Sequence, residues 1–370
     1  MWAEQYDRAD VDLLLIEEEI AREVTRGIAG RLLPAEQAAL AVRPTANPQA
    51  YDHLLRGNYY LAQRSARAAA RAIAEYNAAA RLDSGFVTPL ARIAYAYFLM
   101  LNYGWDYPGV PPESLLARGF EAADHALRRD SLASDAWLAR AALLSVRSPR
   151  SLTPVREAFE RAVALDPGNA EAYHQYGTVL RLLRDDSAAV VAYQRALTLD
   201  PVRPITLAGL AYSAIHARRY EDARRWTDSA LAVDPGFTLA YVARARILLQ
   251  LGAVAEARND AETALRLGDG IGGSAMLTLA EVHAGDTLAA RARVEALLRG
   301  MAHPERPSVR EGEYIGAALI SVGRVEQALA LLQRVRPVGV LLWDSLRLPE
   351  FDAVRSDPRF QRLVEQSRPR

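Results

Sequence analysis

Small and apolar residues recur along the chain with a period of 34 residues. Three sets of positions keep this spacing: Gly177, Ala211 and Ala245; Ala189, Ala223 and Ala257; and Ala196, Ala230 and Ala264. The dipeptide Asp-Pro follows the same period, beginning at Asp166, Asp200 and Asp234. This period predicts a repeated pair of helices, and each pair is too small to bury its own apolar face.

Each unit is predicted to hold two helices of about 12 to 14 residues joined by a tight turn. The segment Leu251-Gly252-Ala253 is one such turn. The recurrent small residues let the two helix backbones approach closely, because a larger side chain there would overpack the contact. The closing proline cannot continue the second helix, so it fixes where the next unit begins.

Looser copies of the unit extend the array in both directions. They cover residues 47–84, 85–131 and 132–167 before the three regular units, and two further pairs follow, marked by Leu277 and Ala290 and by Ile315 and Ala328. We therefore predict an all-α fold, a right-handed α-solenoid of about eight stacked helix hairpins spanning residues 47–336. In the second copy, residues 102–108 lengthen the turn and place three aromatic residues in it, which we interpret as a structural plug rather than a ligand lid.

The two ends of the chain do not match the repeat. An apolar stripe from Val11 to Leu32 predicts a helix within residues 1–46, and Pro34 begins a second, shorter helix. Residues 337–370 are predicted to cap the array, because Asp357-Pro358 is a typical helix start. We expect Phe351, Phe360 and Leu363 to cover the last pair.

The unit resembles the tetratricopeptide repeat, a 34-residue helix–turn–helix whose stacked copies form a concave groove. The resemblance implies a scaffold that binds a protein or peptide in that groove. By repeat position, the predicted groove residues are Tyr95, His174, Thr178, Arg181, Tyr212, His216, Arg246 and Gln250. Chaperone-binding members hold a C-terminal carboxylate with lysine and asparagine, which are missing at these positions, so that class of partner is disfavoured.

Further motifs are similar to bacterial sensor proteins in which a TolB-like domain precedes tetratricopeptide repeats. The motifs are residues 2–8, 17–23, 47–51, 55–57 and 355–360. The resemblance implies that residues 1–46 are a strand and helix remnant of that domain. In this family the module is often joined to a serine/threonine kinase, an adenylate cyclase or a DNA-binding response domain. The chain lacks most of the TolB-like domain and any output domain, so it is a fragment, the product of a late translation start, or a free-standing descendant.

Composition narrows the classes of partner. Hydrophobic residues make up 51% of the chain and 45 acidic residues balance 45 basic ones, the profile of a foldable protein with no overall attraction to nucleic acid or anionic membranes. No apolar run reaches the roughly 20 residues that span a bilayer. With no signal peptide, the expected location is the cytoplasm if Met1 is the true start, or otherwise the extracytoplasmic part of a membrane-anchored sensor. Oligomeric state is not predicted.

The sequence carries no catalytic motif. Cysteine and lysine are both absent, which excludes thiolate chemistry, P-loop lysines and Schiff bases. The histidines have no metal-binding spacing, and we interpret His174 and His216 as polar groove lining. The glycines at 268–273 follow a helix rather than a strand and are interpreted as a turn. We therefore predict no catalytic, cofactor or metal residues and a non-catalytic scaffold, with a regulatory fragment of a kinase or cyclase, or an unrecognised hydrolase, as alternatives.

Overall fold

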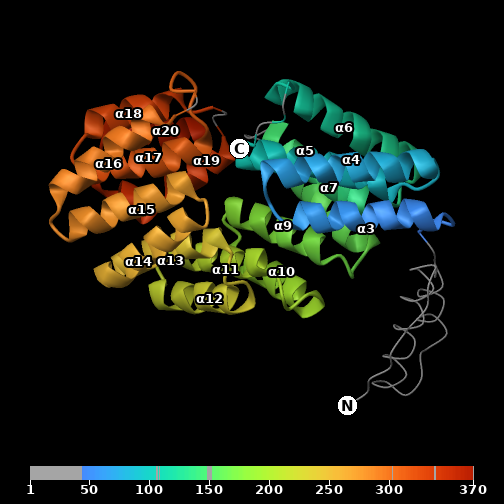
Figure 1. Ribbon diagram of the computed structural model, residues 1–370, viewed down its shortest axis with the longest axis horizontal. Coiled ribbons are helices and arrows are strands. Elements are labelled where there is room, and N and C mark those ends of the chain that lie inside the picture. The colour runs from blue at the N-terminus through green and yellow to red at the C-terminus, as the bar shows by residue number, and fades with distance from the viewer. Residues whose placement is uncertain are drawn as a thin grey trace, which may run out of the picture. The chain divides into compact units, whose positions relative to one another are not determined.

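The computed structural model describes residues 44–105, 107, 109–147, 152–301, 303–336 and 339–369. These residues form α-helices joined mostly by short turns, with no β-strand among them and one isolated bridge between Tyr107 and Val110 (Figure 1). The predicted all-α fold of repeated helical hairpins is confirmed. The helices predicted between residues 11 and 41 lie outside the described residues.

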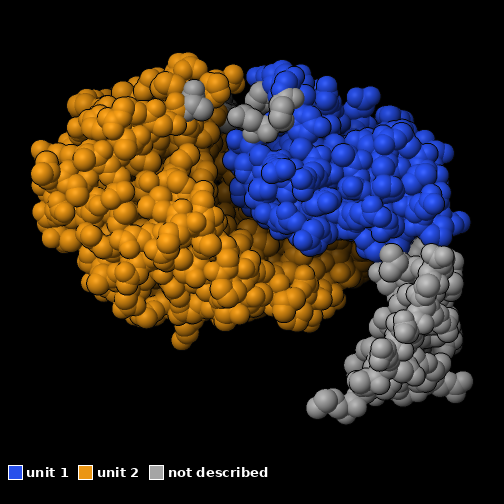
Figure 2. Space-filling model, viewed as in Figure 1, with its two compact units in different colours: residues 1–143 blue, residues 144–370 orange. Residues whose placement is uncertain are grey.

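The chain divides into two compact units, residues 1–143 and 144–370 (Figure 2). The division falls inside α7, so the predicted third pair, α7 and α8, contributes to both. In unit 1 the pairs α3/α4 and α5/α6 pack within themselves, and α4 packs on α5. The helices that begin in unit 1 are α3 (Pro48–Ala62), α4 (Ala66–Leu82), α5 (Thr88–Tyr103), α6 (Pro112–Arg129) and α7 (Ser134–Arg147).

Unit 2 repeats the hairpin five more times, and each second helix also packs on the first helix of the next pair. Its repeat helices are α8 (Thr153–Leu165), α9 (Ala170–Leu182), α10 (Asp186–Leu199), α11 (Pro204–His216), α12 (Tyr220–Val233), α13 (Thr238–Gln250), α14 (Val254–Arg266), α15 (Gly270–His283), α16 (Thr287–Arg299), α17 (Val309–Ser321) and α18 (Val325–Arg334). The three regular units predicted from the period correspond to α9/α10, α11/α12 and α13/α14.

Close helix packing explains the recurrent small residues. The ring of Tyr193 on α10 is fully buried between Gly177 of α9 and Gly209 of α11. A Cβ atom at either glycine would lie within 3 Å of that ring. Gly57 leaves the same kind of space for Tyr76 in unit 1. Small residues are therefore required wherever the facing helix inserts an aromatic ring.

Aspartates end the second helices for a local reason. Asp83, Asp166 and Asp234 each follow a second helix, and each accepts a hydrogen bond of 2.8 Å from the backbone amide of the glycine two residues later. This side-chain turn gives a hydrogen-bond acceptor to an amide in the link between two helix pairs. The recurrent aspartate therefore directs the chain into the next pair.

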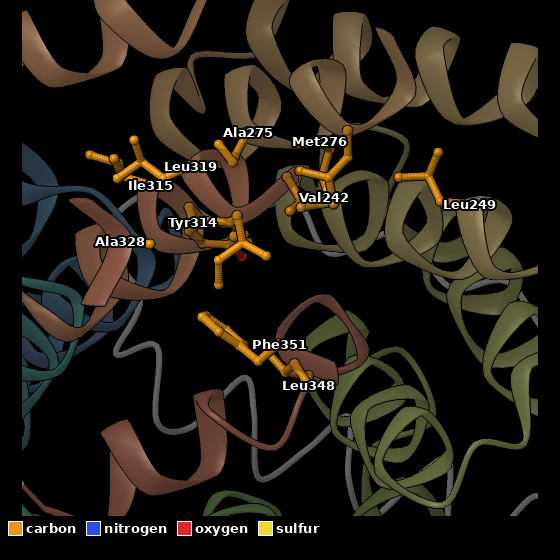
Figure 3. Packing of buried hydrophobic residues seen from close by; sticks show 14 of the residues in the cluster. Val242, Leu249, Ala275, Met276, Tyr314, Ile315, Leu319, Ala328, Leu348 and Phe351 are labelled. Carbon is orange, nitrogen blue, oxygen red and sulfur yellow. The ribbon is translucent and has the colours of Figure 1, made fainter. Parts of the chain in front are cut away.

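The chain ends with α19 (Val340–Ser345), the 3₁₀-helix η1 (Pro349–Val354) and α20 (Pro358–Ser367). α20 packs on α18, whereas α19 packs on both α17 and α9 and η1 packs on α17. Leu342, Leu346, Leu348 and Phe351 are almost fully buried in the main apolar cluster of unit 2, and Leu348 and Phe351 lie opposite α17 in Figure 3. We call residues 340–354 the inner segment, because they cover the first helices of the repeats.

Candidate functional site

The first helices of unit 2 present a row of polar side chains to the inner segment. Arg181 lies in the last turn of α9, His216 ends α11 and Arg246 lies on α13. The repeat places each of them on the face of its helix that meets the inner segment. All three were predicted from repeat position, and the structure joins them to a single partner, the chain's own C-terminal region.

Asp344 of the inner segment connects α9 with α11. Its Oδ2 accepts a hydrogen bond of 2.5 Å from Nη1 of Arg181, and its Oδ1 lies 3.2 Å from Nε2 of His216. Arg347 Nη1 lies 3.8 Å from the same carboxylate. Burial alone would raise the pKa of Asp344, but the charges of Arg181 and His216 outweigh it and hold that pKa well below its ordinary value. The group is therefore an ionised, paired carboxylate and a poor proton donor.

Glu350 is the second acidic contact. It forms an ion pair with Nε of Arg246, a side chain that is only 1% exposed. Nη2 of Arg246 also donates a hydrogen bond of 2.7 Å to Glu313 of α17, and Ser345 donates one of 2.7 Å to the other oxygen of Glu313. Burial disfavours the charge on Arg246, but the two carboxylates outweigh burial and hold its pKa well above the ordinary value.

Aromatic rings complete the surroundings of Arg246. Its guanidinium lies 5.9 Å from the ring centre of Tyr212 and 5.5 Å from that of Tyr314, within the range of cation–π attraction. Burial raises the pKa of both phenols. These tyrosines therefore stay neutral and hydrogen-bonded, and they provide large, rigid contact area rather than acid–base chemistry.

A third contact lies at the rim of the inner segment. Asp352 accepts a hydrogen bond of 2.8 Å from Nη2 of Arg218, the residue that forms the tight turn after α11. Both side chains are partly exposed, 51% for Asp352 and 36% for Arg218. Three carboxylates within nine residues thus meet arginines from α9, the turn after α11 and α13, and the imidazole of His216 on α11.

The other predicted groove residues have different surroundings. His174 Nδ1 lies 3.2 Å from Thr206 Oγ1, and Thr178 shares a hydrogen bond of 3.1 Å with the hydroxyl of Tyr193. Both residues therefore connect neighbouring helices. Gln250, at the end of α13, is exposed.

Tyr95 belongs to unit 1. It is 3% exposed and its ring centre lies 5.5 Å from that of Phe98. Nearby in sequence, Trp105 stacks on Tyr103 at 4.8 Å and Tyr107 meets Tyr97 edge to face. The aromatic residues of the long turn thus pack on one another and on α5, as a structural plug would.

The acidic partners were missed by sequence reasoning. Repeat position locates residues on the first helices, but it gives no position to a segment after the last repeat. A signal did exist, because Asp344 interrupts the apolar run from Val338 to Leu346 and a charge there requires a partner. Within the described chain, no group of three or more metal-ligating side chains comes together, and no helix is long and apolar enough to cross a membrane.

The fold and the buried inner surface define an α-helical repeat protein of stacked hairpins. The family model of the tetratricopeptide repeat matches residues 170–203, which cover α9 and α10 and the turn that follows. The match supports one tetratricopeptide repeat at α9 and α10, and the neighbouring hairpins share its helical-repeat fold. The matched unit carries three of the predicted groove residues, including Arg181.

Similar proteins were found among curated sequences and solved structures. A putative adenylate cyclase 3 of Rhizobium meliloti (strain 1021) is 25% identical over 115 residues, which are 31% of this chain and 19% of that protein. Yeast Tom70 has a TM-score of 0.50 at 16% identity, covering 96% of this chain and 76% of that one. A monomeric mutant of IFIT1 solved with Gppp-AAAA has a TM-score of 0.51 at 13% identity, covering 86% and 76%. The chain thus spans about a fifth of the cyclase, and the two structures show the shared helical-repeat fold alone.

Proposed function

We propose that the chain is a non-catalytic protein-interaction scaffold that binds a peptide or protein segment on the inner surface of α9, α11 and α13. One observation carries the proposal. These helices hold the inner segment, through its carboxylates, by arginines and a histidine set at repeat-determined positions, with Tyr212 beside them. Arginine and tyrosine are the residues that most often anchor protein interfaces.

The test needs probes that do not disturb the buried ion pairs. Gln250 is exposed at the end of α13, one turn beyond Arg246, and Val191 is 65% exposed on the second helix α10. A photoreactive amino acid at Gln250 should cross-link a partner in a lysate of the source organism. The same group at Val191 is the matched control and should not capture it.

The captured protein is then purified and its affinity for the unmodified chain measured. A partner that cross-links equally at both positions, or that does not bind when purified, would show that the inner surface is not the site. Arg246→Ala is a poor probe here, because it leaves two buried carboxylates unpaired and disturbs the fold itself.

A second proposal follows from the cyclase relative. The chain, or the protein to which it belongs, regulates an adenylate cyclase or a kinase as a sensory segment. The support is the sequence similarity over 115 residues together with the resemblance of the chain ends to TolB-like sensor proteins. The genomic reading frame upstream of Met1 tests it: a continuous frame into an output domain supports the proposal, and an in-frame stop codon without such a domain defeats it.

A further inference from the structure

Some buried polar atoms at the interface between the inner segment and the helices beneath it make no hydrogen bond within the described protein. Nε of Arg181, Nδ1 of His216 and Oε2 of Glu350 are buried, yet none makes a hydrogen bond to any described residue. Oδ1 of Asp344 and Nε2 of His216 lie 3.2 Å apart as an ion pair. Buried polar groups are almost always hydrogen-bonded in native proteins. These atoms belong to both sides of the interface, so the inner segment and the helices beneath it are incompletely paired with each other.

The buried ion pairs of this interface are also not needed to hold a permanent cap in place. Replacing a buried ion pair with apolar residues of similar volume is often neutral or stabilising. Leu342, Leu346 and Phe351 already supply an apolar anchor. The pairs of Asp344 and Glu350 therefore add selectivity for an acidic segment, which is what a recognition surface needs.

We propose that the inner surface of unit 2 recognises an acidic, aromatic-containing segment of a partner protein, and that residues 340–354 occupy this site as an internal competitor. The chemistry of the partner segment is inferred from that of residues 340–354, which occupy the same site. It has carboxylates at relative positions 0, 6 and 8, as at Asp344, Glu350 and Asp352, and large apolar residues between them. This inference rests on the proposed scaffold function and adds the chemistry of the ligand and its regulation.

The rim contact gives a variant that loosens the inner segment without leaving a buried charge. Asp352→Lys replaces the ion pairs with Arg218 and Arg355 by like-charge contacts at a half-exposed site. The matched control is Glu365→Lys on α20, the same charge change on an exposed side chain outside the inner segment. Both are made in the full chain, so that the apolar core under the segment stays covered.

Two measurements are made on wild type and both variants. Hydrogen exchange followed by mass spectrometry reports the opening of residues 340–354 relative to α11 and α13. Fluorescence anisotropy reports binding in trans of a labelled synthetic peptide with the sequence of residues 339–356. Because breaking an exposed ion pair and adding repulsion is worth about a fivefold change in equilibrium, Asp352→Lys should exchange and bind about fivefold more readily than wild type. Glu365→Lys should match wild type.

A second peptide tests the recognition itself. With Asn at position 344 and Gln at position 350, the peptide keeps its shape and apolar residues but lacks the two buried carboxylates. It should bind the Asp352→Lys chain at least about tenfold more weakly than the unaltered peptide.

Two results would overturn the inference. If residues 340–354 exchange as slowly as α11 and α13 in all three proteins and no peptide binds, the segment is a permanent cap. If the segment opens but both peptides bind with equal affinity, the inner surface does not recognise the carboxylates. In either case a partner that cross-links selectively at Gln250 leaves the scaffold function standing, so the two failures are distinguishable.

Discussion

For a single residue such as Arg246, the repeat predicts its position on the helix but not the contacts that its side chain makes. The period predicts that it lies on the inner face of α13, and in the structure it is a buried residue of that helix. Its burial could not be predicted, because Glu313 and Glu350 come from elements 67 and 104 residues further along the chain. A residue predicted to line the groove lies at the centre of a buried ionic cluster.

We expect Arg246→Ala to lower the free energy of unfolding by about 3–5 kcal/mol, because it leaves two carboxylates buried without a counter-charge. The control is Arg225→Ala on α12, whose side chain is 77% exposed in its pair with Asp222. It should change stability by less than about 1 kcal/mol. Chemical denaturation of both variants measures the difference. Equal, small effects would show that the cluster does not depend on Arg246.

Arg184 and Arg218 adopt left-handed backbone at the tight turns after α9 and α11, with φ of 66° and 60°. One repeat later the equivalent position is Gly252, with φ of 78°. Left-handed geometry costs a non-glycine residue about 1–2 kcal/mol of stability. Glycine avoids this cost, but its greater conformational freedom in the unfolded chain offsets part of the gain. We therefore expect Arg184→Gly to stabilise the protein by about 0.5–1 kcal/mol.

The reciprocal change completes this test. Gly252→Ala should destabilise by about 1 kcal/mol, because no neighbouring atom lies within 4 Å of the added Cβ and the cost is conformational. Thermal unfolding of the two variants should shift in opposite directions. Shifts of the same sign would contradict the backbone explanation.

At the scale of elements, the hairpins could be predicted from sequence because their causes are local and periodic. Gly177, Ala211 and Ala245 report the close approach of two helices, and aspartates such as Asp166 and Asp234 report the turn to the next pair. α19 and η1 have no such signal. Each is six residues long, and each is held by contacts with helices distant in sequence. Short elements stabilised by tertiary contacts lie beyond what periodicity can indicate.

The packing of Tyr193 provides the prediction for elements. Gly177→Ala places a Cβ atom 2.9 Å from that ring, which is also tightly packed against Gly209 of α11. Overpacking of this kind costs about 1–3 kcal/mol. Gly270→Ala, at the start of α15, meets no atom within 4 Å and should be neutral or slightly stabilising. Denaturant midpoints that fall equally for both variants would show that general loss of glycine, and not the ring, is responsible.

At the scale of the whole unit, the inner segment changes how unit 2 holds together. An open solenoid has contacts only between neighbouring pairs, so its ends unfold independently of its middle. Here Asp344 joins Arg181 across 163 residues of sequence, and the same carboxylate lies beside His216. The sequence predicted the stacking but not this closure, because closure depends on where a non-repeating segment lies. Unit 2 should therefore unfold more cooperatively than a repeat array of its length.

The depressed pKa of Asp344 makes this closure sensitive to acid. Its pKa in the folded chain lies below the value of about 3.9 in an unfolded chain, so the folded state binds its proton less readily. The stabilisation it provides is complete above about pH 4 and is lost as the pH falls further, through the pKa of the folded state. Asp344→Asn lacks this contribution at every pH and leaves Arg181 without its counter-charge. The difference in unfolding free energy between wild type and Asp344→Asn should therefore shrink as the pH falls below about pH 4. Glu365→Gln, on the exposed surface of α20, is the control and should parallel wild type throughout.

Hydrogen exchange in the Asp344→Asn variant should show α9 opening at a lower free energy than α13 and α17, since α9 loses the contact that ties it to the C-terminal region. A difference independent of pH, with α9 as protected as in wild type, would mean that the apolar contacts of the inner segment close the unit without its carboxylates.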